Sequence, residues 1–241
     1  MEKIWLWIIA AVAAFFVKGL CGFANTLVFT SVLGFGINNV NISPVDLILG
    51  YPANLIMIWK NRKKLNPKVC VPLIVIVLAG SIPGAFLLKA ADAKYLKILF
   101  GAVVVFIGAE MLLNDAGKIR LRDSKITLTV IGLLSGIFCG LFGVGALLAA
   151  YIGRVAKTSD EFKGNISAVF AAENTFRILT YSILGVITLQ SLKQVLLMVP
   201  FMLLGLFAGM KSAKYLDERK SRKLVIILLI LSGFILIINN L

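Results

Sequence analysis

Apolar residues are grouped along this chain in long blocks. Predominantly apolar stretches lie at residues 4–36, 43–59, 69–88, 95–113, 126–152, 162–185, 190–210 and 224–239. Six of these have the ordinary length of a helix that crosses the roughly 30 Å hydrocarbon core of a bilayer. The windows 71–88 and 224–238 contain no charged residue. The pattern predicts an all-α integral membrane protein that crosses the bilayer several times.

The first and fifth stretches differ from the others because they are long and are interrupted by glycines. They span 33 and 27 residues. Near their centres they read Lys18-Gly-Leu-Cys-Gly-Phe-Ala-Asn25 and Cys139-Gly-Leu-Phe-Gly-Val-Gly-Ala146. Glycine in a helix interior costs about 1 kcal/mol relative to alanine. Each long stretch therefore predicts two shorter helices separated by a break.

The two interrupted stretches also begin an internal repeat. Matching residues recur in the same order at offsets between 120 and 125. The pairs are Gly19 with Gly140, Gly22 with Gly143, Asn54 with Asn174, Gly80 with Gly205, Gly84 with Gly209, Asp92 with Asp217, and Gly108 with Gly233. The sequence therefore predicts a duplicated unit, with a first transmembrane repeat at 1–114, a cytoplasmic linker at 115–125 and a second transmembrane repeat at 126–241.

The distribution of lysine and arginine predicts how the halves are oriented, because these residues concentrate in cytoplasmic loops. If all eight stretches cross, the inside loops hold 11 of them and the outside loops 12. If the first and fifth stretches are re-entrant hairpins, inside segments 60–68, 118–125, 154–163 and 211–223 hold 18 and outside segments hold five. This favours two inverted repeats, each a re-entrant broken-helix hairpin plus three transmembrane helices. Eight simple spans, four per half, stay open as the alternative.

Composition and charge argue against several classes of function. The chain is 60% hydrophobic, against about half for a soluble domain, and its mean hydropathy is +0.98. The net charge of +14 lies in short clusters between apolar stretches and forms no single basic face, which argues against nucleic acid as a partner. Histidine, the commonest metal ligand and general base, is absent. We expect no metal, no cofactor and no enzymatic activity.

The two glycine breaks form the first candidate site. Irregular backbone at membrane depth is tolerated only where protein or a polar cavity covers it, and a helix starting there carries about half a positive charge at its N-terminus. The N–H groups around Gly22 and Gly143, with Asn25 and Thr26, are the expected donors to an anion. Lys18 adds a full positive charge beside the first break. The structural alternatives are close helix packing by the glycines and a lysine that reaches the membrane surface.

The sixth stretch carries Glu173, Asn174 and Arg177 in an apolar background. We expect Asn174 and its repeat mate Asn54 to face each other across the axis that relates the halves. The planar guanidinium of Arg177 suits an oxyanion, and Glu173, one helical turn away, is a candidate proton-coupling group. A purely structural ion pair between Glu173 and Arg177 stays open. Weaker candidates nearer segment ends are Asp46, Tyr51 and Glu110.

Together these features resemble the sulfite exporter TauE/SafE family. The glycine-rich breaks, an asparagine in the next helix of each half, and a Gly-x3-Gly…Asp…Gly tail in each repeat carry the resemblance, which covers residues 15–238. It implies a multi-pass protein of the cell membrane that moves small sulfur-containing anions such as sulfite or organosulfonates. The segments Phe23–Thr26 and Val144–Ala146 depart from the family's longer glycine run. Lys18 and the pair of Glu173 and Arg177 match no motif of the family.

The sequence thus predicts a secondary transporter that moves a small anion across the plasma membrane by alternating access. Its expected partners are the anion and the lipid bilayer. The residues expected to bind the anion are Lys18, Gly22, Asn25, Thr26, Asn54, Gly143, Asn174 and Arg177. A passive anion channel and a membrane scaffold or assembly protein are the alternatives. The direction of transport, the coupling ion and homo-oligomer formation stay open.

Overall fold

The computed structural model describes residues 4–34, 42–90, 125–142 and 145–215, with scattered positions between 98 and 113 and between 223 and 238. The elements are α1 (Ile4–Cys21), α2 (Asn25–Gly34), α3 (Ile42–Asn61), η1 (Arg62–Lys64), α4 (Pro67–Ala90), α6 (Lys125–Phe142), α7 (Ala146–Val155), α8 (Ser159–Ile183) and α9 (Leu189–Ser212). Residues 115–124 of the predicted linker lie outside the described residues, as do Asp92, Glu110, Gly143 and Asp217.

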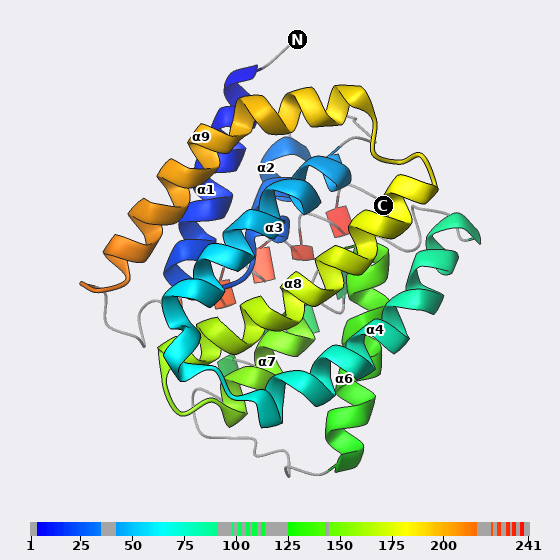
Figure 1. The fold of residues 1–241 in the computed structure, drawn as a ribbon, viewed down its shortest axis with the longest axis vertical. Coiled ribbons are helices and arrows are strands. Elements are labelled where there is room, and N and C mark those ends of the chain that lie inside the picture. The colour runs from blue at the N-terminus through cyan, green and yellow to red at the C-terminus, as the bar shows by residue number, and fades with distance from the viewer. Residues whose placement is uncertain are drawn as a thin grey trace.

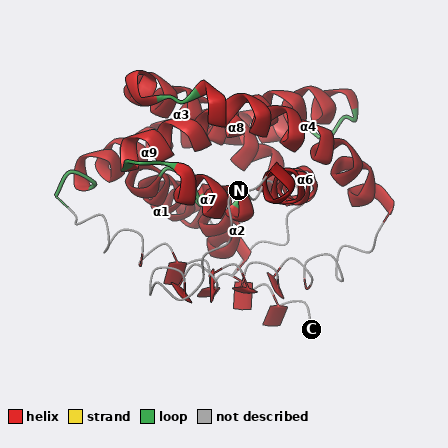
Figure 2. Ribbon diagram, turned by 90° about the horizontal axis from the view of Figure 1, so that it is seen from below, coloured by secondary structure: helices red, strands yellow, loops and turns green. Residues whose placement is uncertain are grey.

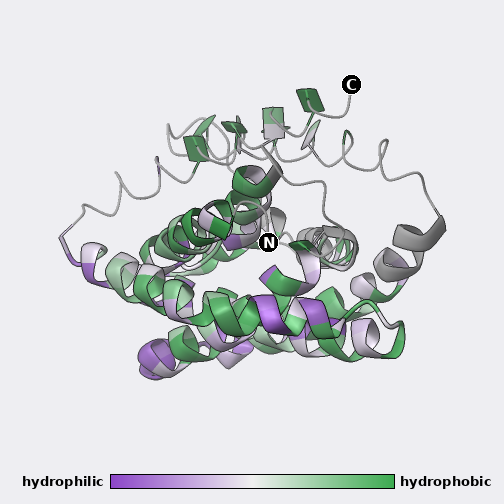
Figure 3. Cartoon of the chain, turned by 90° about the horizontal axis from the view of Figure 1, so that it is seen from above, coloured by the Kyte–Doolittle hydropathy of each residue, from purple (hydrophilic) through white to green (hydrophobic). Residues whose placement is uncertain are grey.

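All elements in the described part of the chain are helices, as the sequence predicts. Four of them are long and apolar enough to cross a membrane: Ile4–Cys21, Ile42–Lys64, Pro67–Gly84 and Leu189–Ser212. Hydrophobic residues cover most of the described helices, and hydrophilic residues gather on a few turns (Figure 3). The fold therefore agrees with an all-α membrane protein.

Both long stretches are broken at their glycines. The first helix ends at Cys21 and the next begins at Asn25, and in the second half α6 ends at Phe142 and α7 begins at Ala146. In the first break Gly22 has φ +91°, which glycine adopts at no steric cost. Ala24 has φ 70°, a conformation that is uncommon for a residue with a side chain.

The α2 helix folds back along α1. The rings of Trp7 in α1 and Phe29 in α2 meet edge to face with their centroids 5.9 Å apart. A straight helix would separate these two positions by about 33 Å, at 1.5 Å per residue. The shorter helix α2 thus packs along the longer helix α1, and the break lies at the turn between them.

Two helix pairs flank the molecule, α1 with α9 on one side and α4 with α6 on the other (Figure 1). Glycines let each pair approach to backbone contact, since a Cβ atom at any of these glycines would collide with the carbonyl oxygen of the partner helix. The contacts are Gly205 on Val12, Gly209 on Phe16, Gly80 on Leu133 and Gly84 on Ile137. The repeat relates Gly205 to Gly80 and Val12 to Leu133. It likewise relates Gly209 to Gly84 and Phe16 to Ile137. The same interface therefore occurs twice, with the halves exchanged.

A side chain at Gly209 should break one of these interfaces. We expect Gly209→Val to destabilise the protein by about 1–3 kcal/mol, because the added methyl groups force α9 away from the backbone of α1. The neighbouring Ala208 lies on the exposed face of α9, so Ala208→Val is the matched control. Thermal unfolding in detergent should show a lower Tm for the first variant only. Equal Tm values would contradict the close packing.

The α3 and α8 helices cross at the centre of the molecule, with α2 and α7 beneath them and between the two flanking pairs (Figure 2). They run antiparallel. Near the middle, the Thr175 hydroxyl donates to the Tyr51 hydroxyl at 3.4 Å. Toward one end, Gly164 of α8 packs against Asn61 of α3. The four central helices bring both breaks to the same region of the molecule.

Beyond that end, hydrogen bonds join the α3–α4 connection to the start of α8. The Asn66 backbone N–H donates to Asn165 Oδ1 at 2.9 Å, and the Asn66 amide donates to Glu161 Oε1 at 3.2 Å. The Lys157 backbone N–H donates to the other oxygen of Glu161 at 3.0 Å. The bond from Lys157 and then the bond from Asn66 lower the pKa of the Glu161 carboxyl below its usual value. The two connections therefore lie on one face of the protein.

Candidate functional site

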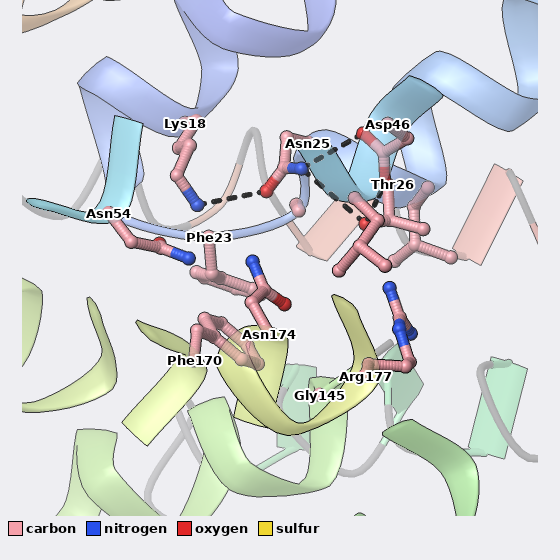
Figure 4. Close-up of a pocket in the computed structure, with 13 residues that line it drawn as sticks. Lys18, Phe23, Asn25, Thr26, Asp46, Asn54, Gly145, Phe170, Asn174 and Arg177 are labelled. Atoms are coloured by element: carbon pink, nitrogen blue, oxygen red, sulfur yellow. Dashed lines mark hydrogen bonds between the residues drawn. The ribbon is translucent and has the colours of Figure 1, made fainter. Parts of the chain in front are cut away.

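A pocket lies where the two helix breaks meet α3 and α8 (Figure 4). Its walls come from the end of α1, the segment after it, the start of α2, the middle of α3 and α8, and Gly145 at the start of α7. The lining residues are Lys18, Phe23, Ala24, Asn25, Thr26, Leu27, Asp46, Leu47, Asn54, Gly145, Phe170, Asn174 and Arg177. Both half-helices, α2 and α7, therefore begin at this pocket.

Of the nine residues expected from the sequence to bind the anion or couple a proton, six line the pocket together: Lys18, Asn25, Thr26, Asn54, Asn174 and Arg177. Gly22 and Glu173 do not line it. Gly22 is outside the lining and packs against Lys163 at the start of α8. Glu173 lies beside Arg177 but does not line the pocket. Gly143 lies outside the described residues, although Gly145 of the same break reaches the pocket wall.

Lys18 is held in the pocket by the residue that begins α2. Its side chain is 1% exposed, and its ammonium donates to Asn25 Oδ1 at 3.0 Å. The same ammonium lies 5.7 Å from the centre of the Phe170 ring, within the range of a cation–π contact. Lys18 therefore points into the protein interior, which excludes a lysine that reaches the membrane surface.

Asp46 of α3 anchors the start of α2. Its Oδ1 accepts from the Asn25 amide at 3.0 Å, and its Oδ2 accepts from the Thr26 hydroxyl at 2.5 Å. Asn25 thus bridges a cation and a carboxylate, because it accepts from Lys18 and donates to Asp46 (Figure 4). Hydrogen bonds to an ionised group are about twice as strong as neutral ones, so this chain fixes the first turn of α2.

Arg177 enters the pocket from α8. Its guanidinium donates to the carbonyl oxygen of Cys139, in the last turn of α6, at 2.7 Å. Its Nε lies 3.8 Å from Glu173 Oε1, which is within ion-pair range but too far for a hydrogen bond. Neither of these two buried atoms has a hydrogen-bond partner. One nitrogen of Arg177 therefore holds the end of the broken helix, and its Nε lies beside Glu173, while the residue itself lines the pocket.

Asn54 and Asn174, the pair related by the repeat, both line the pocket. Gly50 of α3 faces two amides, since a Cβ atom there would be in ordinary van der Waals contact with them, 3.5 Å from Asn25 Nδ2 and 3.6 Å from Asn174 Nδ2. The side-chain oxygen of Asn54, Oδ1, is buried without a hydrogen-bond partner. An unpaired buried polar group costs about 1–3 kcal/mol. Because this side-chain oxygen only accepts, a hydrogen-bond donor bound in the pocket would recover that cost.

Asp46, a weaker candidate in the sequence, also lines the pocket. It is the only acidic residue in the stretch 43–59. Its place near the start of that stretch suggested a position at the membrane surface, whereas it lies in the pocket with 2% of its surface exposed. The aromatic walls Phe23 and Phe170 were not singled out, because single aromatic residues in an apolar chain carry no distinguishing signal. Tyr51 lies outside the pocket lining.

The pocket combines fixed positive charge with neutral donors. Lys18 and Arg177 bring two cations, Asn25, Asn54 and Asn174 bring amides, and the described lining contains one carboxylate, Asp46. Charges that are removed from water interact far more strongly than they do at a surface. The described residues contain no group of three His, Cys, Asp or Glu side chains that could hold a metal ion. The arrangement can bind a small polar anion without a metal.

No curated protein and no solved structure matches the chain. The model of the sulfite exporter TauE/SafE family matches residues 6–236, which include both helix breaks and every residue of the pocket. Because the match extends over nearly the whole sequence, the chain belongs to the sulfite exporter TauE/SafE family.

Proposed function

We propose that this protein is a secondary transporter that binds a small sulfur-containing oxyanion, such as sulfite or an organosulfonate, in the pocket between the two helix breaks. The observation that carries this proposal is the convergence of Lys18 and Arg177 at the starts of two half-helices. Fixed donors and the positive ends of helices suit an anion. The membership of a family named for sulfite export supports a sulfur-containing substrate.

The arrangement of the connections supports re-entrant hairpins and inverted repeats. Asn66 bonds directly to Glu161 and Asn165, and Lys60 lies within electrostatic range of Lys163 and Lys214. The basic segments 60–68, 154–163 and the end of α9 are thus neighbours. Eight simple spans would place the first of these segments on the opposite side of the bilayer from the other two. The hairpin topology puts all three in the cytoplasm, as the charge count favours.

The repeated helix pairs support alternating access. The α1–α9 pair joins the first helix of one half to the last described helix of the other, and the α4–α6 pair does the same with the halves exchanged. Each tight pair can move as a unit against the central α3–α8 crossing. In inverted-repeat transporters such rocking exposes a central site to each side in turn.

Counterflow in proteoliposomes tests this function. Vesicles loaded with unlabelled methanesulfonate or sulfite should take up the labelled anion faster than unloaded vesicles, and the rate should saturate with concentration. Protein-free vesicles are the control. A flux that rises linearly and ignores the loaded anion would indicate a channel. The absence of any protein-dependent flux for either anion would contradict anion transport.

A further inference from the structure

The two half-helices that begin at the pocket differ in one respect. The start of α2 already holds an anion of the protein itself, since both oxygens of Asp46 accept hydrogen bonds from Asn25 and Thr26. At the repeat offset of 120, the position in α8 that corresponds to Asp46 is Ile166, which is buried in the core. The second half therefore has no carboxylate at the corresponding position. A substrate anion would therefore lie near a carboxylate on the side of the pocket where α2 begins, and the second half offers no carboxylate at the matching position.

The charges around Asp46 come from two helices. Lys18 of α1 and Arg177 of α8 are the charged residues that act on it within the described part of the chain. The α2 helix presents only the uncharged Asn25 and Thr26. The α9 helix, which also packs against α3, carries its lysines only near its two ends. Lys18 and Asp46 are linked through Asn25 and have no direct hydrogen bond between them.

The charge balance makes a bound anion costly while Asp46 is ionised. The positive charges of Lys18 and Arg177 are balanced by the negative charges of Asp46 in the pocket wall and of Glu173 beside Arg177. An added anion would leave this enclosed cluster with a net negative charge, which is unfavourable away from water. One proton on Asp46 removes that excess. The protonated carboxyl can still accept from one neighbour.

We propose that Asp46 is a proton-binding site of the pocket and that one proton binds there together with each substrate anion. This inference rests on the proposed function and names its coupling ion. The proton comes from the aqueous side to which the pocket is open, and it returns to water with the anion on the other side. Glu173, the group that the sequence favoured for this role, lies behind Arg177 and outside the pocket lining. It serves instead to hold Arg177 in place.

Equilibrium binding of methanesulfonate to the purified protein tests the proposal, because this anion stays ionised between about pH 5 and 9 and does not titrate itself. For one linked proton the affinity should rise as the pH falls, by up to about tenfold per pH unit. In Asp46→Asn the affinity should become independent of pH. Asp46→Glu, the matched control, retains a carboxyl group and should keep the pH dependence of the wild type. Glu173→Gln removes a negative charge from the same cluster, so it should bind the anion more tightly at neutral pH and show a weaker pH dependence.

Proton uptake gives a second readout that needs no variant. In a weakly buffered solution above neutral pH, binding to the wild-type protein should take up about one proton per anion. Binding without proton uptake would overturn the role of Asp46 and leave anion transport intact. A pH dependence that persists in Asp46→Asn would overturn it too. If neither methanesulfonate nor sulfite binds at any pH, the proposed function itself fails.

Discussion

Replacing Arg177 by glutamine should abolish anion counterflow. The guanidinium is buried in the pocket wall and brings one of the two cations there. Removing one member of a buried, charge-assisted contact costs about 2–5 kcal/mol, which corresponds to a loss of roughly 30-fold to several thousand-fold in affinity. Counterflow of methanesulfonate, measured over a range of concentrations, should therefore fall to the level of protein-free vesicles.

A second variant separates this effect from misfolding. Arg177→Gln leaves Glu173 as a buried charge without its partner, so the single variant should also be less stable, by about 3–5 kcal/mol. The double variant Glu173→Gln with Arg177→Gln removes both charges and should regain most of that stability. It should not regain counterflow. Wild-type counterflow in the double variant would show that the ion pair is only structural.

Replacing Lys18 by methionine should have the next largest effect. The variant keeps the apolar part of the side chain but removes the ammonium that donates to Asn25, so the pocket loses one of its two cations. We expect at least about a tenfold loss of affinity for the anion, which is about 1.4 kcal/mol. The concentration dependence of counterflow measures this loss. Lys193→Met, at an exposed position near the start of α9, removes the same charge outside the pocket.

These two lysine variants give opposite expectations for the same change of net charge. If both weaken counterflow equally, the effect of Lys18 is one of overall charge and its place in the pocket is irrelevant. If neither does, Lys18 has no role in binding. The role assigned to Lys18 requires a loss in Lys18→Met and unchanged kinetics in Lys193→Met.

Much of the fold follows from the sequence because its signals are local. The lengths of the apolar stretches predict the membrane helices, and clustered glycines predict the breaks that the structure has after Cys21 and Phe142. Packing between distant helices is harder to predict. Gly80 and Gly205 mark the repeat in the sequence, but only the structure shows that each lies on the backbone of the other half's first helix.

The pocket was predicted in part for a related reason. Lys18, Asn54 and Arg177 stand out because a polar side chain within an apolar stretch needs a partner or a cavity. Asp46 meets the start of α2 only because α2 folds back along α1. No local sequence pattern encodes that reversal. In the same way, the bond from Arg177 to the carbonyl of Cys139 joins residues that are far apart in the chain.

Binding of the anion between the two helix breaks can be tested by locating a bound sulfonate directly. Crystals of the protein with bromoethanesulfonate would reveal the ligand through the anomalous scattering of bromine. A bromine peak is expected in the pocket, with the sulfonate oxygens within hydrogen-bond distance of Arg177 and Lys18. The peak should be absent from crystals of the Arg177→Gln variant with Glu173→Gln. An ordered sulfonate bound elsewhere in the protein, with the pocket empty, would contradict it.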